Sequence, residues 1–131
     1  MNSKLIVSAI RISRERLKNH PEFLFKGYIH FSFLILRGKL IAIGLNHRGN
    51  NPIQYGYPTY GKIHSEIDSY RKAKGLLKGD SFSLINIRLG RRGILRNSKP
   101  CLFCQNLLKE LNCKEICYST ERGFDSLSIN P

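Results

Sequence analysis

The stretch Phe82–Leu89, FSLINIRL, decides the fold, because five of its eight residues are large and apolar and they fall at both even and odd positions. A strand with apolar residues in both alternating sets of positions is typically buried on both faces of a sheet. We therefore expect this segment to be a central strand that is covered by helices.

The residues before this strand predict a hairpin and a helix. His30–Leu36 (HFSFLIL) and Leu40–Leu45 (LIAIGL) are β-rich runs, and the short link between them, Arg37-Gly38-Lys39, predicts a turn. Apolar residues recur at helical spacing from Ile63 to Leu77, which predicts a helix over His64–Leu77 with one buried face. The intervening residues 46–63 are rich in Gly, Asn, Pro and Tyr and predict a long loop, which in a compact domain is usually functional.

The residues after the central strand predict a basic loop (GRRGILRNSK, 90–99), a helix over Cys101–Leu111 and a strand over Glu115–Thr120. Only eleven residues follow Thr120, and a parallel crossover needs about a dozen before its strand begins. A fifth strand over Ser126–Ile129 should therefore return antiparallel through a turn at 121–123. The order β-β-α-β-α-β indicates an α/β protein with a mixed sheet.

Composition limits the class of protein. The chain has 131 residues, of which 41% are hydrophobic, and this favours a single globular domain over residues 1–131. No apolar run reaches the roughly 20 residues of a membrane helix. The N-terminal segment, with a basic amphipathic helix expected over 9–19, does not resemble a signal peptide. We therefore expect a cytoplasmic, reducing environment, in which the four cysteines favour metal binding or catalysis over disulfides.

The net charge of +13, with an isoelectric point near 10, favours a polyanionic partner. A solvated basic surface with no such partner is the alternative. Charge alone does not identify any chemistry.

Two short motifs carry the chemistry, His64-Ser65-Glu66 and Pro100-Cys101-Leu102-Phe103-Cys104, and each opens a predicted helix. Cys101 and Cys104 are three residues apart and share a helix face. Helical side chains tilt toward the N-terminus of their helix, so the two helix starts can converge on one metal ion. Either motif alone is weak, because His-x-Glu is common in helices and an isolated Cys-x-x-Cys is also typical of redox sites.

One imidazole and two thiolates leave the fourth tetrahedral position of zinc open, which is the pattern of catalytic sites. Zinc lowers the pKa of a bound water to about 7 and so supplies a nucleophile. Glu66 is not needed as a ligand and is placed to move protons. The alternative of a structural four-cysteine site with Cys113 and Cys117 conflicts with geometry, since Cys104 and Cys113 would lie roughly 13 Å apart along a helix. We read those two residues as ordinary buried thiols.

These motifs, in their order and context, resemble the zinc-dependent cytidine and deoxycytidylate deaminase superfamily, whose signature is H-x-E…P-C-x-x-C. The matching stretches are GKLIAIGLN, KIHSEIDSYRKAK and SKPCLFCQNLLKELNCKEICYST. The resemblance implies a three-layer α-β-α sandwich around a mixed five-stranded sheet with an antiparallel last strand. It implies Zn²⁺ on His64, Cys101 and Cys104, with Glu66 protonating the ring nitrogen and then the departing ammonia.

The resemblance also implies substrate contacts. Asn46 would bind the sugar or the base, and the backbone around Ser65 would meet the pyrimidine carbonyl. Pro100 and Tyr118 are further substrate-binding candidates. The sequence departs from the family in two places: Ser65 stands where Ala is commoner, and Ser98-Lys99 replaces an acidic residue often found before Pro-Cys.

The substrate class rests on charge and aromatic residues. A group of basic residues precedes the zinc cysteines: Arg91, Arg92, Arg96 and Lys99. A group of tyrosines precedes His64: Tyr55, Tyr57 and Tyr60. Such a mixture suits stacking on bases and contact with phosphates, although the tyrosines could equally pack within their loop and the arginines could clamp one phosphate or remain solvated. We expect a hydrolytic deaminase of a cytosine-type base in a nucleotide or a single-stranded nucleic acid.

Two other functions stay open. One is an adenosine deaminase that acts on RNA. The other is a non-catalytic zinc-containing nucleic-acid-binding protein, which would have no use for Glu66. No membrane partner is expected, and the sequence leaves a homo-oligomer open.

Overall fold

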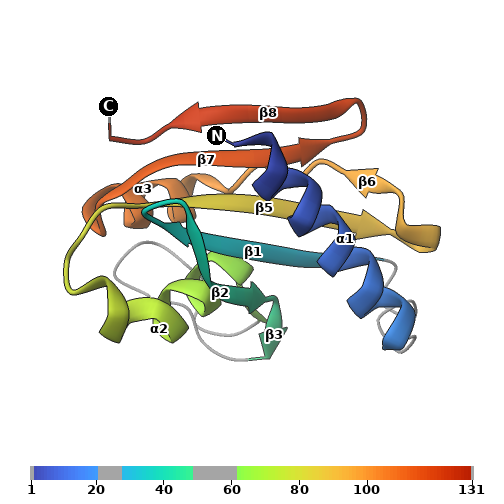
Figure 1. Ribbon diagram of the computed structural model, residues 1–131, viewed down its shortest axis with the longest axis horizontal. Coiled ribbons are helices and arrows are strands. Elements are labelled where there is room, and N and C mark those ends of the chain that lie inside the picture. The colour runs from blue at the N-terminus through green and yellow to red at the C-terminus, as the bar shows by residue number, and fades with distance from the viewer. Residues whose placement is uncertain (1, 21–27, 49–61, 131) are drawn as a thin grey trace.

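The computed structural model describes residues 2–20, 28–48 and 62–130. In chain order its elements are α1 (Ser3–Asn19), β1 (Tyr28–Leu36), β2 (Lys39–Leu45), β3 (His47–Arg48), β4 (Lys62–Ile63), α2 (Ser65–Leu77), β5 (Phe82–Gly90), η3 (Arg91–Gly93), β6 (Leu95–Arg96), α3 (Leu102–Glu110), β7 (Cys113–Thr120) and β8 (Gly123–Ser128). Figure 1 shows the sheet running through the middle of the molecule.

The main sheet has the strand order β2-β1-β5-β7-β8, with β6 beside β5. Strands β5 and β7 are parallel, and every other pair in this sheet is antiparallel. The expected central strand, mixed sheet and antiparallel last strand are thus confirmed. The β1–β2 turn has positive φ at Arg37 (51°) and Gly38 (76°), as the two-residue turns that match strand twist require.

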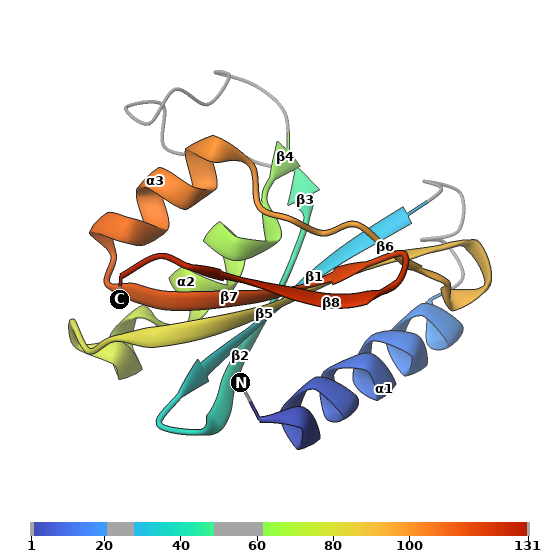
Figure 2. The same cartoon turned by 90° about the horizontal axis from the view of Figure 1, so that it is seen from above.

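The helices form a layer on each side of the sheet. Figure 2 shows α1 on one face, with α2 and α3 on the other. Alternation along β1 separates two cores, because Phe31 and Phe33 face α1 whereas Leu34 faces α2 and α3. Both phenylalanines have 0% exposure, and burial of each contributes about 1.5–3 kcal/mol. The expected three-layer arrangement is present.

The structure corrects the expectations at three places. Helix α1 begins at Ser3, earlier than expected, because the Asn2 side chain caps it by accepting a hydrogen bond from the Lys4 N–H (2.8 Å). The basic loop 90–99 contains η3 and β6, so the sheet has six strands where five were expected. Leu95 lies opposite Leu89 and packs on the α1-side core, and this burial explains the extra strand.

The third correction concerns the long segment 46–63. Its two described ends pair as strands, with His47 opposite Ile63. This pairing places the end of β2 beside the start of α2. Among the described residues, no helix is both long and apolar enough to span a bilayer.

Candidate metal centre

The three predicted ligands lie at the N-termini of two helices. His64 is the N-cap of α2 and Cys101 is the N-cap of α3, while Cys104 lies in the first turn of α3. The Nδ1 atom of His64 is 3.6 Å from Cys101 Sγ and 3.2 Å from Cys104 Sγ. In the described part of the chain, these three residues form the one group of His, Cys, Asp or Glu side chains close enough to hold a metal ion, with ligand atoms within 4.8 Å of one another.

This arrangement fits zinc. Tetrahedral zinc has bonds of about 2.0 Å to nitrogen and 2.3 Å to sulfur, which separate its ligand atoms by roughly 3.5–3.8 Å. The separations of 3.6 and 3.2 Å from His64 Nδ1 to the two sulfur atoms lie close to this range. Three donors leave one position open, as expected for a catalytic rather than a structural site.

The electrostatics favour a cation between these residues. Hydrogen bonding from Cys104 lowers the pKa of the Cys101 thiol to about 4, aided by His64 and opposed by burial. Hydrogen bonding with Cys101 in turn raises the pKa of His64. The negative charge of this thiolate that favours a proton on His64 also favours Zn²⁺. The metal ion and the proton compete for the same donor atoms.

Glu66 lies in the first turn of α2 and is 6% exposed. Burial raises the pKa of its carboxyl group, against opposing effects that include a hydrogen bond from the Ser65 hydroxyl to Oε1 (3.1 Å). A buried carboxyl group with a raised pKa suits proton transfer.

A cavity of about 230 Å³ lies against His64, Cys101 and Glu66. The predicted site residues that line it are His64, Ser65, Glu66, Cys101, Asn46 and Pro100. Asn46 is held in place because its Oδ1 accepts a hydrogen bond from the backbone N–H of His30 (3.1 Å). Tyr118 does not line this cavity. It is 9% exposed and packs in the core between the sheet and helices α2 and α3, and this placement runs against its expected contact with substrate. Tyr55, Tyr57 and Tyr60 lie outside the described residues.

The basic residues are divided between two places. Lys99 is exposed and lines the cavity. Arg91, Arg92 and Arg96 are exposed on η3 and β6 and do not line it. Arg96 forms an ion pair with Glu121 (3.2 Å). Only Lys99 of the predicted basic group is therefore placed to contact a bound base or its sugar.

The cavity also contains residues that the sequence analysis missed, namely His30, Ile63 and Ser98. Burial lowers the pKa of His30 to about 4, with smaller effects from Arg88 and His64, so its imidazole is neutral at physiological pH. The available signal was the alternation of polar His30 and Ser32 with phenylalanines in an otherwise apolar strand.

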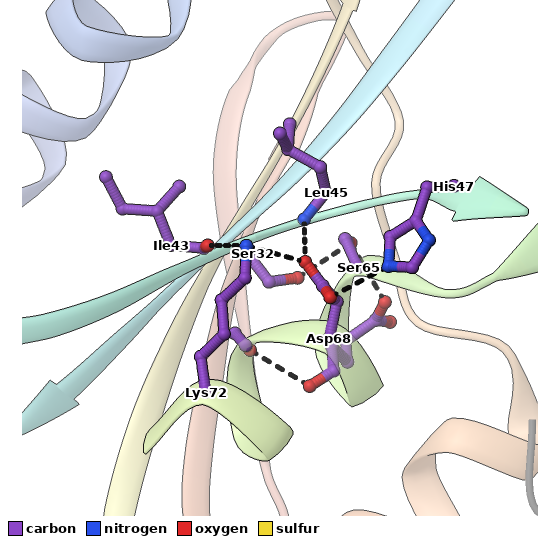
Figure 3. A network of polar contacts seen from close by, with 9 residues as sticks. Ser32, Ile43, Leu45, His47, Ser65, Asp68 and Lys72 are labelled. Atoms are coloured by element: carbon purple, nitrogen blue, oxygen red, sulfur yellow. Dashed lines mark hydrogen bonds and ion pairs between the residues drawn. The ribbon is translucent and has the colours of Figure 1, made fainter. Parts of the chain in front are cut away.

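Asp68 anchors helix α2 to the edge of the sheet (Figure 3). Its Oδ2 accepts from the Leu45 N–H (2.9 Å) and pairs with Lys72 (3.0 Å), while Oδ1 lies 2.9 Å from His47 Nε2. Burial acts to raise the pKa of Asp68, but these hydrogen bonds outweigh it and the pKa is lowered. This network holds the helix that carries His64 and Glu66.

Gly44 allows the same helix to approach β2 closely. A Cβ atom at this position would collide with the backbone oxygen of Ser65 and the backbone nitrogen of Ser69. Any larger residue would therefore push the first turn of α2, and with it the metal centre, away from the sheet.

Cys113 and Cys117 are buried, with 0% and 5% exposure. Burial raises the pKa of both thiols, that of Cys113 to about 12. Their reading as ordinary buried thiols agrees with this placement.

No protein-family model and no curated protein sequence matches the chain. Solved structures are similar to it. Cytidine deaminase from Burkholderia pseudomallei aligns with a TM-score of 0.54 and 13% identity, over 80% of this chain and 78% of that one. Cytidine deaminase from Mycobacterium leprae aligns with a TM-score of 0.48 and 16% identity, over 78% and 76%.

The apo dCMP deaminase from cyanophage S-TIM5 aligns with a TM-score of 0.47 and 17% identity, over 68% of this chain and 64% of the phage enzyme. This chain thus matches less than two thirds of that enzyme's length. At such identities the likeness concerns the fold, for which the Burkholderia structure is the relevant comparison. The chain has the cytidine deaminase-like α/β fold, with a mixed six-stranded sheet between its helices.

Proposed function

We propose that this chain is a zinc-dependent hydrolytic deaminase that converts a cytosine-type base to uracil. The observation that carries the proposal is the group of one imidazole and two thiols with ligand atoms within 4.8 Å of one another, beside a cavity that His64, Cys101 and the buried carboxyl group of Glu66 line. The cytidine deaminase-like fold supports it. A purely structural zinc site has no use for the carboxyl group of Glu66.

His64, Cys101 and Cys104 would hold the zinc ion, which when bound supplies the Lewis acidity that activates a water molecule. Glu66 would accept the proton of that water and deliver it to the ring nitrogen of the base. Glu66 would then accept the remaining proton of the added hydroxyl group and deliver it to the amino group, which leaves as ammonia while the carbonyl bond forms. The balance is base plus water giving uracil plus ammonia, with no oxidant or reductant.

The cavity volume supports a base as the group that enters. Pockets for drug-sized ligands span roughly 300–1,000 Å³, and this cavity, at about 230 Å³, is smaller. Asn46 and the N-terminus of α2 present polar groups to it. The sugar and phosphate would then lie near its mouth, where Lys99 is exposed.

The substrate we propose is a nucleotide or a single-stranded nucleic acid, supported by the net charge of +13 and by the exposed arginines of η3 and β6. Zinc-loaded protein should be incubated with cytidine, dCMP, single-stranded DNA and RNA, and the products analysed for uracil. An adenosine-containing RNA is included to test the adenosine alternative. Absence of any deaminated product, with zinc bound, would contradict the proposal and favour the non-catalytic alternative.

A further inference from the structure

Beneath the metal centre, a chain of buried polar side chains joins the segments that carry the two halves of the site. Ser65, Ser32, Asn86 and Ser98 are at most 3% exposed. The Ser65 and Ser32 hydroxyl oxygens are 2.8 Å apart (Figure 3). Because Ser32 gives its one hydroxyl proton to Asn86, Ser65 is the donor in this contact, and it shares that proton with Glu66 Oε1. The Ser32 hydroxyl donates to Asn86 Oδ1 (2.7 Å), and Asn86 Nδ2 donates to the Ser98 carbonyl (3.3 Å).

The strand register produces this chain. Ser32 on β1 lies opposite Gly44 on β2 and opposite Asn86 on β5. Residues directly opposite one another share a face of the sheet, so these three positions form one row under α2. Gly44 admits the helix backbone, and Ser32 then lies within reach of Ser65.

The side-chain amide of Asn86 is the central link because both its oxygen and its nitrogen form hydrogen bonds within the chain. Its oxygen accepts from Ser32 and its nitrogen donates to Ser98. A Ser98 hydroxyl contact with the Asn86 carbonyl (2.9 Å) makes a second bond between the same two residues. An apolar side chain at this position could make neither amide bond, and an ionised Asp could not donate to Ser98.

The two ends of the chain lie next to the ligands. Ser65 follows His64 directly, and Ser98 precedes Cys101 by three residues, with Pro100 between them. Proline fixes its own φ and restricts the residue before it, so a displacement of Ser98 passes readily to Cys101. The Ser98 N–H also donates to the Ser119 carbonyl (2.8 Å), which ties this segment to β7.

We propose that Asn86, with Ser32 as its partner, is a positioning residue that sets the distance between His64 and the cysteine pair. The inference rests on the proposed zinc function. Its basis is that buried polar groups which are fully hydrogen-bonded hold a specific geometry, and zinc tolerates little error in ligand separation. In this role Ser32 acts on the site through Ser65 and Asn86 acts through Ser98; neither binds the metal.

The test measures Zn²⁺ affinity by competition with a chromophoric chelator, together with the visible spectrum of the Co²⁺-substituted protein. Ser32→Ala and Asn86→Leu should each weaken Zn²⁺ binding by about 10-fold, the lower end of what loss of a ligand's own hydrogen-bond partner costs, because they act on the ligands through Ser65 and Ser98. Their Co²⁺ spectra should differ from wild type, because the ligand geometry changes. Ser32→Thr keeps the hydroxyl and should restore both properties.

Ser13→Ala is the matched control. Ser13 is also 0% exposed, but it lies on α1 and donates to the Ala9 carbonyl (2.8 Å), on the other side of the sheet. It should lower stability without changing Zn²⁺ affinity or the Co²⁺ spectrum. If Ser32→Ala, like Ser13→Ala, changes neither Zn²⁺ affinity nor the Co²⁺ spectrum, the inference is wrong. This comparison tests the inference even if Asn86→Leu fails to fold. A wild-type chain that binds neither metal would instead contradict the proposed function, and the inference with it.

Discussion

The Nδ1 atom of His64 lies 3.2 Å from Cys104 Sγ, although 40 residues separate them in the sequence. The two residues belong to different helices, and each lies within the first turn or at the N-cap. Their proximity depends on β5 and β7 being adjacent and parallel, which brings the segment after β5 beside the start of α2. The chemistry of the site therefore follows from the sheet topology.

Thiol reactivity should distinguish the cysteines in the metal-free protein. Because the pKa of Cys101 is lowered to about 4, this thiol is ionised at neutral pH, and its alkylation by iodoacetamide should change little between pH 6 and pH 9. Cys113, with a pKa raised to about 12 and no exposure, should not react. Peptide mass spectrometry identifies the modified residue, and Zn²⁺ should protect Cys101. Preferential modification of Cys113 would contradict this account.

His30 should make the fold sensitive to acid. Its pKa is about 4 in the folded chain, whereas a solvated histidine in the unfolded chain has a pKa of 6.5, so the unfolded chain binds more protons below pH 6.5. Stability is therefore present above pH 6.5 and is lost as pH falls toward 4. Between pH 7 and pH 5 the loss should be on the order of 2 kcal/mol.

The measurement is urea unfolding of the metal-free protein at pH 7 and at pH 5, for wild type and His30→Gln. The variant should lose less stability over this interval, because it lacks the titrating group. An equal loss in both proteins would show that His30 does not titrate as inferred.

The ligand assignment predicts the outcome of cysteine substitutions. Cys104→Ser should abolish tight zinc binding, since a hydroxyl group replaces a thiolate ligand. Cys113→Ser and Cys117→Ser should retain one zinc ion per chain, although each lowers stability by placing a hydroxyl in the core. Elemental analysis of the folded variants checks this. Loss of zinc from either of the latter two would refute the three-residue site.

The exposed arginines predict a salt dependence if the substrate is a polynucleotide. Each neutralised phosphate on a single strand contributes a log–log slope of about −0.7. We expect oligonucleotide affinity to fall with a slope of magnitude about two or more, on the order of three contacts. Arg91→Ala with Arg92→Ala should flatten this slope and leave the zinc content unchanged.

Lys39→Ala with Lys109→Ala removes the same charge from the start of β2 and the end of α3, outside the η3–β6 segment, and serves as the control. A slope that both double variants flatten equally would indicate a nonspecific charge effect. Weak, salt-insensitive binding beside rapid dCMP turnover would instead identify a free-nucleotide substrate.

Sequence periodicity was sufficient to predict β5, α2 and the order of the main elements, because long apolar patterns leave few alternatives. The two helix starts at His64 and Cys101 could also be predicted from the sequence, since histidine and cysteine have a defined metal chemistry. Strand β6 could not be predicted, because Leu95–Arg96 is too short to show any periodicity. It pairs with Arg88 and Leu89 of β5, beyond the last β5–β7 pair at Asn86.

Ser32 and Asn86 were missed for a related reason. A single polar residue in an apolar strand shows that something is buried with it, but its partners depend on register. Only the alignment of Ser32 with both Gly44 and Asn86 reveals the polar row beneath the site. Tyr118 was expected to contact the substrate, but its side chain packs into the core, and the sequence of β7 does not show which of its faces is covered.

The most direct test of the central claim compares wild type with Glu66→Gln, using zinc content and uracil formation from dCMP and from a cytosine-containing single strand. Both proteins should bind one zinc ion per chain, because Glu66 is not among the ligands. Wild type should form uracil, and the variant should be slower by about 10²- to 10⁴-fold, the usual contribution of a general acid–base group. Equal turnover in the two proteins, or a zinc-loaded wild type that deaminates neither substrate, would contradict the account.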